Sequence, residues 1–473
     1  MRIRRIVSHA ALDDLEPVFA KIRKDAGIRD GYSQEAYFEA EHGGGEDDPS
    51  HVVGTRIDRT DLPVVTIDPV GSRDLDQALH IESRDDGFRV FYAIADVASH
   101  VLPGGPLDFD TKQRVETIYS PDKRIGLHPP TLSEGYASLL PGQRTKAALW
   151  TIDIDANGER THAKVERAWV RSRHQYSYPQ LQDDAPPEAA ELVRLLAKVG
   201  HVRRSLMRSR GAVTLPKPSQ EVVVKNGLVD LEFEAARPIE DDNAQISLLT
   251  GETAAGMMLE AGHGILRTMP PVTSRALARL RRQATGIGVE WPDDVDYAGL
   301  LDSLDTKNPR TAAFLTQAVT LFRGAMWQSF DDRGDLPRPE NLVHGALAAP
   351  YAHVTAPLRR LVDRYGTEIC IAHSLQQPTP QWVAEALPWI GKEMARGSRL
   401  AKKVDRGCTD AVESAMLRPF VGQKFEAVGL DRDTVQVADP AVVAKCTGNI
   451  RIGKRQHVTL NKVDGKTGPK FAA

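Results

Sequence analysis

Apolar residues near the start of the chain recur at helical spacing. Over residues 12–26 they share one face of a helix, and residues 33–42 are predicted to form a second, shorter helix. The stretch GGGEDDPS at 43–50 then interrupts the pattern with glycine, acidic and proline residues, which is typical of a linker. We therefore predict a small helical module and linker over residues 1–60, for which a helix-turn-helix is one candidate arrangement.

The pattern changes to short β-rich runs from about residue 61 to residue 175. The predicted strands are VVTID, QALHIE, FRVFYAIADV and AALWTIDI. Beyond them the apolar residues return to helical spacing, and the predicted helices span 186–207, 246–266, 274–283 and 311–330. Thr355 is a suitable N-cap for a further helix over 356–373, with Pro357 near its first turn.

Five short apolar runs follow residue 415. They are FEAVGL, TVQVAD, AVVAKC, NIRI and HVTLNKV, and five strands in so short a segment fit a small OB-type barrel. The expected fold class is α+β. We predict a mixed domain over 61–385 with a β-rich first half and a helical second half, a connecting helix over 386–414, and a five-stranded barrel over 415–473.

The composition is that of an ordinary globular protein. The chain has 473 residues, of which 41% are hydrophobic and 26% are charged. It contains no apolar run of the roughly 18 residues that a transmembrane helix needs, and its first residues do not resemble a secretory signal, so we expect no membrane contact. The three cysteines lie far apart, which excludes a cysteine zinc site, disfavours disulfides and indicates the reducing cytoplasm.

The charge is unevenly distributed along the chain. The formal net charge is −3, yet from Lys445 onward seven lysines and arginines stand against one acid, Asp464. A basic segment of this kind either forms a solvated tail or binds a polyanion, and its composition leaves both interpretations open.

Three aspartates surround one predicted turn. A strand ends at Asp68, a turn with proline, glycine and serine follows, and Asp74 and Asp76 precede the next strand. Carboxylates at alternate positions of an extended backbone point the same way. With no lysine among them they repel one another, and a hard divalent cation such as Mg²⁺ would hold them together. The alternatives are a solvated turn whose aspartates cap backbone groups and, less favoured because the EF-hand pattern is absent, a calcium loop.

Further motifs accompany the aspartates in a fixed order. TIDP and SRDLDQAL are followed by IADVASHV, TIYSP, SLLPGQRTKAAL, YSYPQLQ and HGALAAPYAHVTAPLRRLVDRYG. Together they resemble the motifs of the ribonuclease II (RNB-domain) family over residues 62–375, and the C-terminal segment resembles that family's S1-type OB domain. The resemblance implies an RNB catalytic domain over 61–385 and an S1 domain over 415–473.

The resemblance assigns the aspartates to an acidic quartet that holds magnesium and activates water. Asp68, Asp74 and Asp76 match its first three members, and Gln77 stands where the family typically has a fourth aspartate. An amide oxygen can ligate a metal but brings no charge. We therefore expect a site for Mg²⁺, with Mn²⁺ as a substitute, that has weaker affinity for the metal or depends on a second ion.

The resemblance also assigns a role to the motif APLRR. Arg359 matches the family's essential arginine beside the scissile phosphate, and Arg360 is a candidate for RNA backbone contact. If the helix begins near Thr355, Arg359 lies in its first turn, where free N–H groups and the helix dipole favour a phosphate. Taken alone, the motif favours an ordinary surface arginine at the start of a helix.

Other matched positions imply contacts with the RNA 3′ end. Tyr119 and Tyr178 match tyrosines that contact terminal nucleotides, where aromatic rings accept any base by stacking. Glu252 matches a glutamate near the last nucleotide, and a hydrogen bond that it accepts from a 2′-hydroxyl would favour RNA over DNA. Leu215 stands where the family often has a phenylalanine, so we expect a looser clamp on the final base. Without the resemblance, both tyrosines read as packing residues and Glu252 as a solvated one.

The function implied is processive 3′-to-5′ hydrolysis of single-stranded RNA to nucleoside 5′-monophosphates by a monomeric cytoplasmic enzyme. Family members usually carry two cold-shock domains before the catalytic domain, whereas here the first 60 residues read as helical, so the RNA entrance must be built differently. Two alternatives remain open. One is a catalytically impaired RNA-binding or regulatory protein on the RNB scaffold, and the other is a DNA or general phosphodiesterase.

Overall fold

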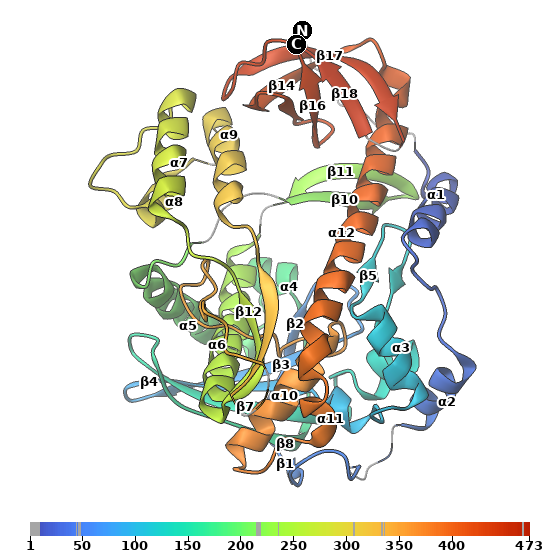
Figure 1. Cartoon of the computed structure of the whole chain (residues 1–473), viewed down its shortest axis with the longest axis vertical. Coiled ribbons are helices and arrows are strands. Elements are labelled where there is room, and N and C mark those ends of the chain that lie inside the picture. The colour runs from blue at the N-terminus through green and yellow to red at the C-terminus, as the bar shows by residue number, and fades with distance from the viewer. Residues whose placement is uncertain are drawn as a thin grey trace.

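The computed structural model describes residues 10–43, 45, 49–213, 219–234, 236–305, 308–332, 334, 336–465 and 468–473. Figure 1 shows a sheet with its helices at one end of the long axis and a small barrel at the other, joined by one long helix. The predicted role of Leu215 falls outside the described residues. None of the helices in these ranges is both long and apolar enough to cross a bilayer.

A five-stranded sheet forms the centre of the larger part. Its order is β1 (Ile57–Asp58), β8 (Arg160–Arg171), β7 (Arg144–Asp155), β4 (Gly87–Ala95) and β3 (Gln77–Arg84). β1 pairs parallel to β8, and the remaining neighbours are antiparallel. The strands predicted from QALHIE, FRVFYAIADV and AALWTIDI are confirmed as β3, β4 and β7.

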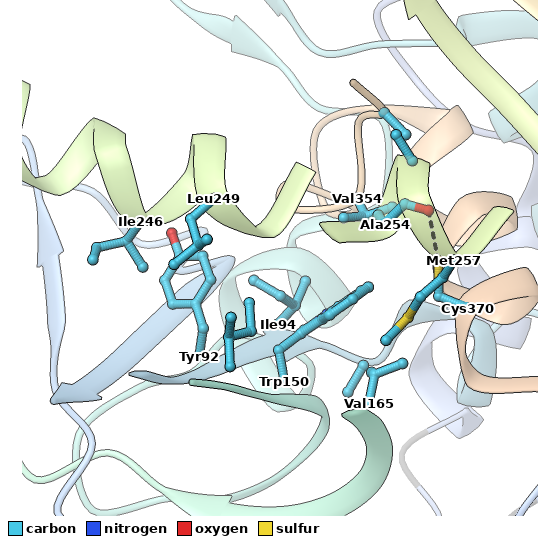
Figure 2. Close-up of a cluster of buried hydrophobic side chains, with 14 of the residues drawn as sticks. Tyr92, Ile94, Trp150, Val165, Ile246, Leu249, Ala254, Met257, Val354 and Cys370 are labelled. Carbon is cyan, nitrogen blue, oxygen red and sulfur yellow. Dashed lines mark hydrogen bonds between the residues drawn. The ribbon is translucent and has the colours of Figure 1, made fainter. Parts of the chain in front are cut away.

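The sheet is buried on both faces. Along β4, Tyr92 and Ile94 enter the main apolar core, while the alternating Phe91 and Ala93 enter a second core on the other face. Figure 2 shows Tyr92, Ile94 and Trp150 of the sheet packing against side chains of the helix above them. Strands covered on two sides carry nearly continuous apolar runs, which explains why these segments were recognisable in the sequence.

Helices α5 (Ala190–Ser209), α6 (Pro238–Ala261) and α10 (Leu361–Ser374) belong to this core. The helix predicted over 246–266 is wrong at its end, because α6 ends at Ala261 and Gly262 adopts a left-handed C-cap conformation with φ +78°. The helix predicted over 311–330 is also too long. Its last residues form β13 (Met326–Asp331), which pairs antiparallel with β12 (His263–Thr268).

A separate helical lobe comprises α7 (Ser274–Ile287), α8 (Tyr297–Ser303) and α9 (Pro309–Ala318), which share an apolar core of their own. α9 contacts the C-terminal barrel, where Gln317 Nε2 donates to the Leu430 carbonyl over 3.4 Å. Figure 1 shows this lobe beside the barrel, at the same end of the long axis.

The C-terminal segment forms a closed five-stranded barrel, as predicted. Its order is β14 (Lys424–Asp431), β15 (Thr434–Val437), β16 (Val442–Thr447), β18 (Gly468–Ala472) and β17 (Arg455–Asp464). One strand was assigned to the wrong segment. NIRI at 449–452 is a loop that forms a single bridge through Ile452, and the fifth strand is β18, which closes the barrel between β16 and β17.

The long helix α12 (Leu387–Leu417) connects the two ends of the molecule. One apolar core joins it to the barrel, to the hairpin β10 (Ser219–Lys225) and β11 (Leu228–Glu234), and to α1 (Leu12–Asp25). The second N-terminal helix, α2 (Gln34–His42), instead packs on α3 (Pro106–Arg114). Both N-terminal helices are confirmed, but they have different neighbours and do not pair as a helix-turn-helix. The domain boundaries drawn from the sequence stay predictions.

A buried carboxyl between α12 and the hairpin gives a prediction about stability. Glu413 is 4% exposed, Gln220 Nε2 donates to its Oε1 over 2.8 Å, and burial raises its pKa to about 7. Because that pKa exceeds the value in an unfolded chain, the stability that Glu413 contributes is present at low pH and is lost as the pH rises through about 7. Glu413→Gln keeps the acceptor and stays neutral. We expect it to raise the unfolding temperature by a few degrees at about pH 8 and not at about pH 5.

Thermal unfolding of both proteins at the two pH values provides the measurement. Asp433→Asn is a matched control, because Asp433 is an exposed barrel carboxylate paired with Lys445 and its pKa lies below the usual value. An equal effect of Glu413→Gln at both pH values would contradict the prediction.

Candidate active site

The parallel pairing of two short strands places Asp68 beside Tyr178. β2 (Thr66–Asp68) pairs with β9 (Gln175–Ser177) so that Asp68 stands opposite Ser177. Helix α4 (Tyr178–Asp183) begins at the next residue, and the Ser177 side chain caps it by accepting from the Gln180 N–H. The Tyr178 hydroxyl accepts a hydrogen bond from Asn243 Nδ2 over 3.1 Å, which fixes the ring against α6.

The second part of the aspartate motif is anchored at its middle residue. Leu75 is fully buried, and its N–H donates to Ser138 Oγ over 2.9 Å, so Asp74 and Asp76 flank an anchored residue. Asp76 is 2% exposed, and its carbonyl accepts from the Ala95 N–H at the end of β4. Its carboxylate contacts the loop that carries Arg359.

Asp76 and Arg359, 283 residues apart in sequence, form an ion pair. Arg359 Nε donates to Asp76 Oδ2 over 2.7 Å, and the Leu358 N–H donates to Asp76 Oδ1 over 2.7 Å. The Arg359 side chain remains 40% exposed, so its guanidinium lies at the boundary between the buried carboxylate and solvent. The two motifs that the sequence pointed to therefore meet at one place.

The structure corrects the predicted start of the following helix. α10 begins at Leu361, and Thr355 does not cap it. Residues 356–360 form a turn that Asp363 closes, because its carboxylate accepts from the Ala356 N–H over 2.7 Å and from both Nε and Nη2 of Arg360. Arg359 therefore precedes the helix. The predicted position of Arg359 in the first turn of this helix is therefore wrong, and the free N–H groups of that turn are no reason for it to bind a phosphate.

A short segment before β5 (Ile118–Tyr119) aligns with this turn. Glu116 forms a backbone bridge to Arg360, and the Thr117 N–H donates to the Arg359 carbonyl over 2.9 Å. These bonds bring Tyr119 beside the Arg359 guanidinium, and the tyrosine is 53% exposed. Tyr119 is thus an accessible aromatic side chain next to the arginine, as a residue that stacks on a base must be.

Two of the aspartates, Asp68 and Asp76, have raised pKa values. Burial, followed by repulsion from Asp76, raises the pKa of Asp68 to about 7. Burial raises the pKa of Asp76 to about 6, against the opposing effect of Arg359. One carboxylate oxygen of Asp68, Oδ2, is buried and has no hydrogen-bond partner among the described residues. A buried anionic oxygen without a donor is unfavourable, so this atom is suited to a cation.

Arginines neutralise the other two aspartates. Arg124 forms an ion pair with Asp74, and Arg359 does so with Asp76. The sequence has no lysine among these carboxylates, and in the structure two arginines from elsewhere in the chain reduce the repulsion that was expected between them. In the part of the chain that the structure describes, no three His, Cys, Asp or Glu side chains stand as a ready-made metal site. The donor chemistry nevertheless fits a hard cation, since Asp68, Asp74 and Asp76 offer carboxylate oxygens and one of those oxygens is unsatisfied.

The side chain of Gln77, which was predicted to be a metal ligand, is hydrogen-bonded at both ends of its amide. Its Nε2 donates to the Thr355 carbonyl over 2.7 Å, and its Oε1 accepts from the Tyr92 hydroxyl. Tyr92 in turn contacts Ser247 of α6 over 2.8 Å. The amide therefore connects the start of β3 to the segment before Arg359. Metal ligation by Gln77 stays a prediction, and the geometry supports a structural role because both ends of the amide are engaged.

Glu252 lies on a different network. Arg203 Nη2 donates to its Oε2 over 2.7 Å, and Arg210 Nη1 is 3.4 Å from the same atom, so the glutamate is held to α5. Its Oε1 is buried without a hydrogen-bond partner among the described residues, which leaves one acceptor for a ligand. Sequence reasoning missed Arg124 and Arg203, because an isolated arginine outside a motif gives no signal of the carboxylate it will meet.

Comparisons with known proteins identify the family of the chain. The RNB domain model matches residues 56–372, and the model of the RNase II-type exonuclease C-terminal S1 domain matches residues 423–469. Ribonuclease R of Escherichia coli is 27% identical over 415 residues, which is 81% of this chain and 49% of ribonuclease R. The exosome complex exonuclease RRP44 homolog A of Arabidopsis thaliana is 29% identical over 330 residues, 65% of this chain and 34% of its own length. The chain spans half or less of the length of these relatives.

Solved structures share the fold at low sequence identity. Mycoplasma genitalium RNase R in complex with ribose methylated single-stranded RNA has a TM-score of 0.84 and 18% identity, covering 97% of this chain and 78% of that one. Yeast Ssd1, a pseudonuclease, has a TM-score of 0.66 and 14% identity, covering 90% of this chain and 55% of that one. With two thirds of its length matched to the RNB model and its barrel matched to the S1 model, the chain belongs to the RNB-domain family and carries the C-terminal S1 domain of RNase II-type exonucleases.

Proposed function

We propose that the protein is a metal-dependent exoribonuclease that hydrolyses single-stranded RNA from its 3′ end and releases nucleoside 5′-monophosphates. The observation that carries the proposal is the ion pair between Asp76 and Arg359, beside the unsatisfied oxygen of Asp68. This pair joins a cluster of carboxylates to a partly exposed guanidinium. The carboxylates could bind a cation, and the guanidinium could bind a phosphate beside it. The names of the relatives, ribonuclease R and an exosome exonuclease, support the same activity.

The metal site would be formed by Asp68, Asp74 and Asp76. Magnesium bound there would supply the positive charge that activates the attacking water and neutralises the phosphate. Asp74 would have to give up Arg124 to take part, because that ion pair occupies it here. Gln77 contributes structure and not charge, which supports a weaker hold on the cation than a fourth carboxylate would give.

Arg359 would act on the phosphate. Its Nε is committed to Asp76, which fixes the plane of the guanidinium and directs its terminal nitrogens to Tyr119 and to solvent. Donors held in place before the reaction stabilise the charge that develops on the phosphate oxygens in the transition state. Tyr119 and Tyr178 would stack on the terminal bases, and Glu252 would accept from a 2′-hydroxyl. One relative in this fold is solved with single-stranded RNA, which supports that substrate class.

A time course with a 5′-labelled single-stranded RNA tests the proposal. The full chain is incubated with Mg²⁺, with Mn²⁺ or with chelator, and a DNA of the same sequence is run beside it. We expect stepwise 3′ shortening of the RNA with either metal and none with chelator. RNA binding without shortening in any metal would instead identify the catalytically impaired RNA-binding or regulatory protein; yeast Ssd1, which shares the fold, is described as a pseudonuclease. Equal cleavage of the DNA would identify a general phosphodiesterase.

A further inference from the structure

A short hairpin carries two residues of the candidate site. β5 pairs antiparallel with β6 (Arg124–Ile125), so that Ile118 stands opposite Ile125 and Tyr119 stands opposite Arg124. Because successive side chains of a strand point to opposite faces, the two isoleucines share one face of this β5–β6 hairpin, and Tyr119 and Arg124 share the other. The Arg124 guanidinium forms the ion pair with Asp74. The polar face of the hairpin therefore lies against the aspartate motif.

The apolar face of the same hairpin lies against the N-terminal helix. Ile118 and Ile125 are 3% and 5% exposed, and they belong to the apolar core that also contains Leu15 and Phe19 of α1 and residues of α12. Figure 1 shows α1 and β5 beside the same long helix, α12. Apolar burial keeps the hairpin on this core, but it is not directional and does not fix where the tip of the hairpin lies.

A buried arginine of α1 binds the tip. Arg23 is 2% exposed, and its Nη1 and Nη2 donate to the two carboxylate oxygens of Asp122 over 2.6 and 2.8 Å. Nη1 also donates to Ser120 Oγ over 2.7 Å, and that hydroxyl donates to the Lys123 carbonyl over 2.8 Å. A guanidinium that binds a carboxylate through two parallel bonds fixes direction as well as distance. Arg23 thus holds the whole connection between Tyr119 and Arg124.

Two further contacts join the N-terminal module to the hairpin. Lys123 Nζ donates to Asp30 Oδ2 over 2.7 Å, and the Tyr32 hydroxyl donates to the Gly126 carbonyl over 2.6 Å. The side chains of Lys123 and Asp30 are 43% and 53% exposed, and an exposed ion pair contributes little to stability. The buried pair of Arg23 with Asp122 is therefore the contact that we expect to determine the position of the tip.

We propose that Arg23 is a positioning residue of the active site, through which the N-terminal helix holds the β5–β6 hairpin with Tyr119 at Arg359 and Arg124 at Asp74. The inference rests on the proposed function for the role of Tyr119. Arg23 acts through the hairpin, because its guanidinium binds the connection while the two neighbouring side chains face the site. The N-terminal helical module is in this way a structural part of the catalytic centre.

Hydrogen exchange in the full chain tests whether Arg23 holds the hairpin. In Arg23→Gln we expect the amides of residues 117–127 to exchange about tenfold faster, the effect of one charged hydrogen bond on local opening, while those of β4 keep their rates. Asp122→Asn keeps an acceptor for the guanidinium, so it should give a smaller increase at the same amides, and it replaces Arg23→Gln if that variant does not fold. Lys21→Gln is the charge-matched control, since Lys21 is exposed on α1 and pairs with Asp25. Faster exchange throughout the chain, or none in the hairpin, overturns the proposal.

Affinity for a single-stranded oligoadenylate, measured in chelator, tests whether that position matters to the site. We expect Arg23→Gln to weaken binding about tenfold, which is the size of one base-stacking contact, and by less than about twofold when Tyr119 is already alanine. Such a double-mutant cycle isolates the part of the effect that passes through Tyr119. Arg23→Lys keeps the charge without the fork and should give an intermediate loss. An equal loss in both backgrounds is the result of a purely structural role and overturns the proposal.

Neither measurement needs turnover, so the inference and the proposed function can fail separately. A protein that cleaves no RNA, but shows local exchange and a non-additive loss of affinity for Arg23→Gln, supports the role of Arg23 and contradicts the proposed function. If Tyr119→Ala binds the oligoadenylate as the parent does, the stacking role in the proposed function is wrong. The exchange rates of residues 117–127 then decide by themselves whether Arg23 holds the hairpin.

Discussion

Asp76→Asn is expected to lower the rate of RNA hydrolysis by about 10³-fold or more while leaving RNA binding nearly unchanged. Asparagine has the shape of aspartate and keeps an acceptor for the Leu358 N–H, so the loop before α10 stays in place. It loses the charge that pairs with Arg359 and that would hold the cation. Removing a group that stabilises the transition state typically costs about 10²–10³-fold, and here one substitution affects both partners.

The experiment compares initial rates and equilibrium RNA binding for the variant and the parent in the same metal. Asp85→Asn is the matched control, because Asp85 is an exposed aspartate in the turn between β3 and β4. The unfolding temperature of Asp76→Asn should be equal to or higher than that of the parent, since the substitution removes a buried charge with a raised pKa. A variant that retains full turnover, or that fails to bind RNA although folded, would refute the role assigned to Asp76.

Arg359 is the second position at which a large effect is expected. Arg359→Lys and Arg359→Gln should both lower kcat about 10²–10³-fold, because neither reproduces the fork of donors that contacts Asp76 and a phosphate together. The two variants should differ in their pH dependence. Arg359 lowers the pKa of both Asp68 and Asp76, so its charge favours the ionised carboxylates that bind a cation.

Removing that charge in Arg359→Gln should raise both carboxyl pKa values. The carboxylates would then remain protonated to a higher pH, and the acidic limb of the rate profile should move upward. Arg359→Lys keeps the charge, so its acidic limb should stay near that of the parent even though its rate is low. Rate profiles between about pH 5 and pH 9 at saturating metal provide the measurement. Identical limbs for the two variants would show that Arg359 does not control the ionisation of the aspartates.

The periodic elements were predictable because their signal is local. β4 alternates side chains between two cores, and the aspartates of the motif flank a single turn, so both patterns can be recognised within twenty residues. The helix at 274–283 and the closed barrel were found for the same reason. The incorrect predictions concern short apolar runs, whose spacing is compatible with a helix as well as with a strand. The segments 263–268 and 326–331 became strands because each pairs with the other across the ribbon.

The chemical groups of the site can be read from the sequence, namely three aspartates at one turn and an arginine in a distant motif, and so can the family that their order indicates. Which of these groups meet, and which are already paired, follows only from the folded arrangement of the chain. Arg359 reaches Asp76 because Asp363 folds the preceding residues into a turn, Arg124 reaches Asp74, and Gln77 is bound by Tyr92 and Thr355. Periodicity reports how one segment is buried, whereas ion pairs and hydrogen bonds between segments depend on the packing of the whole core.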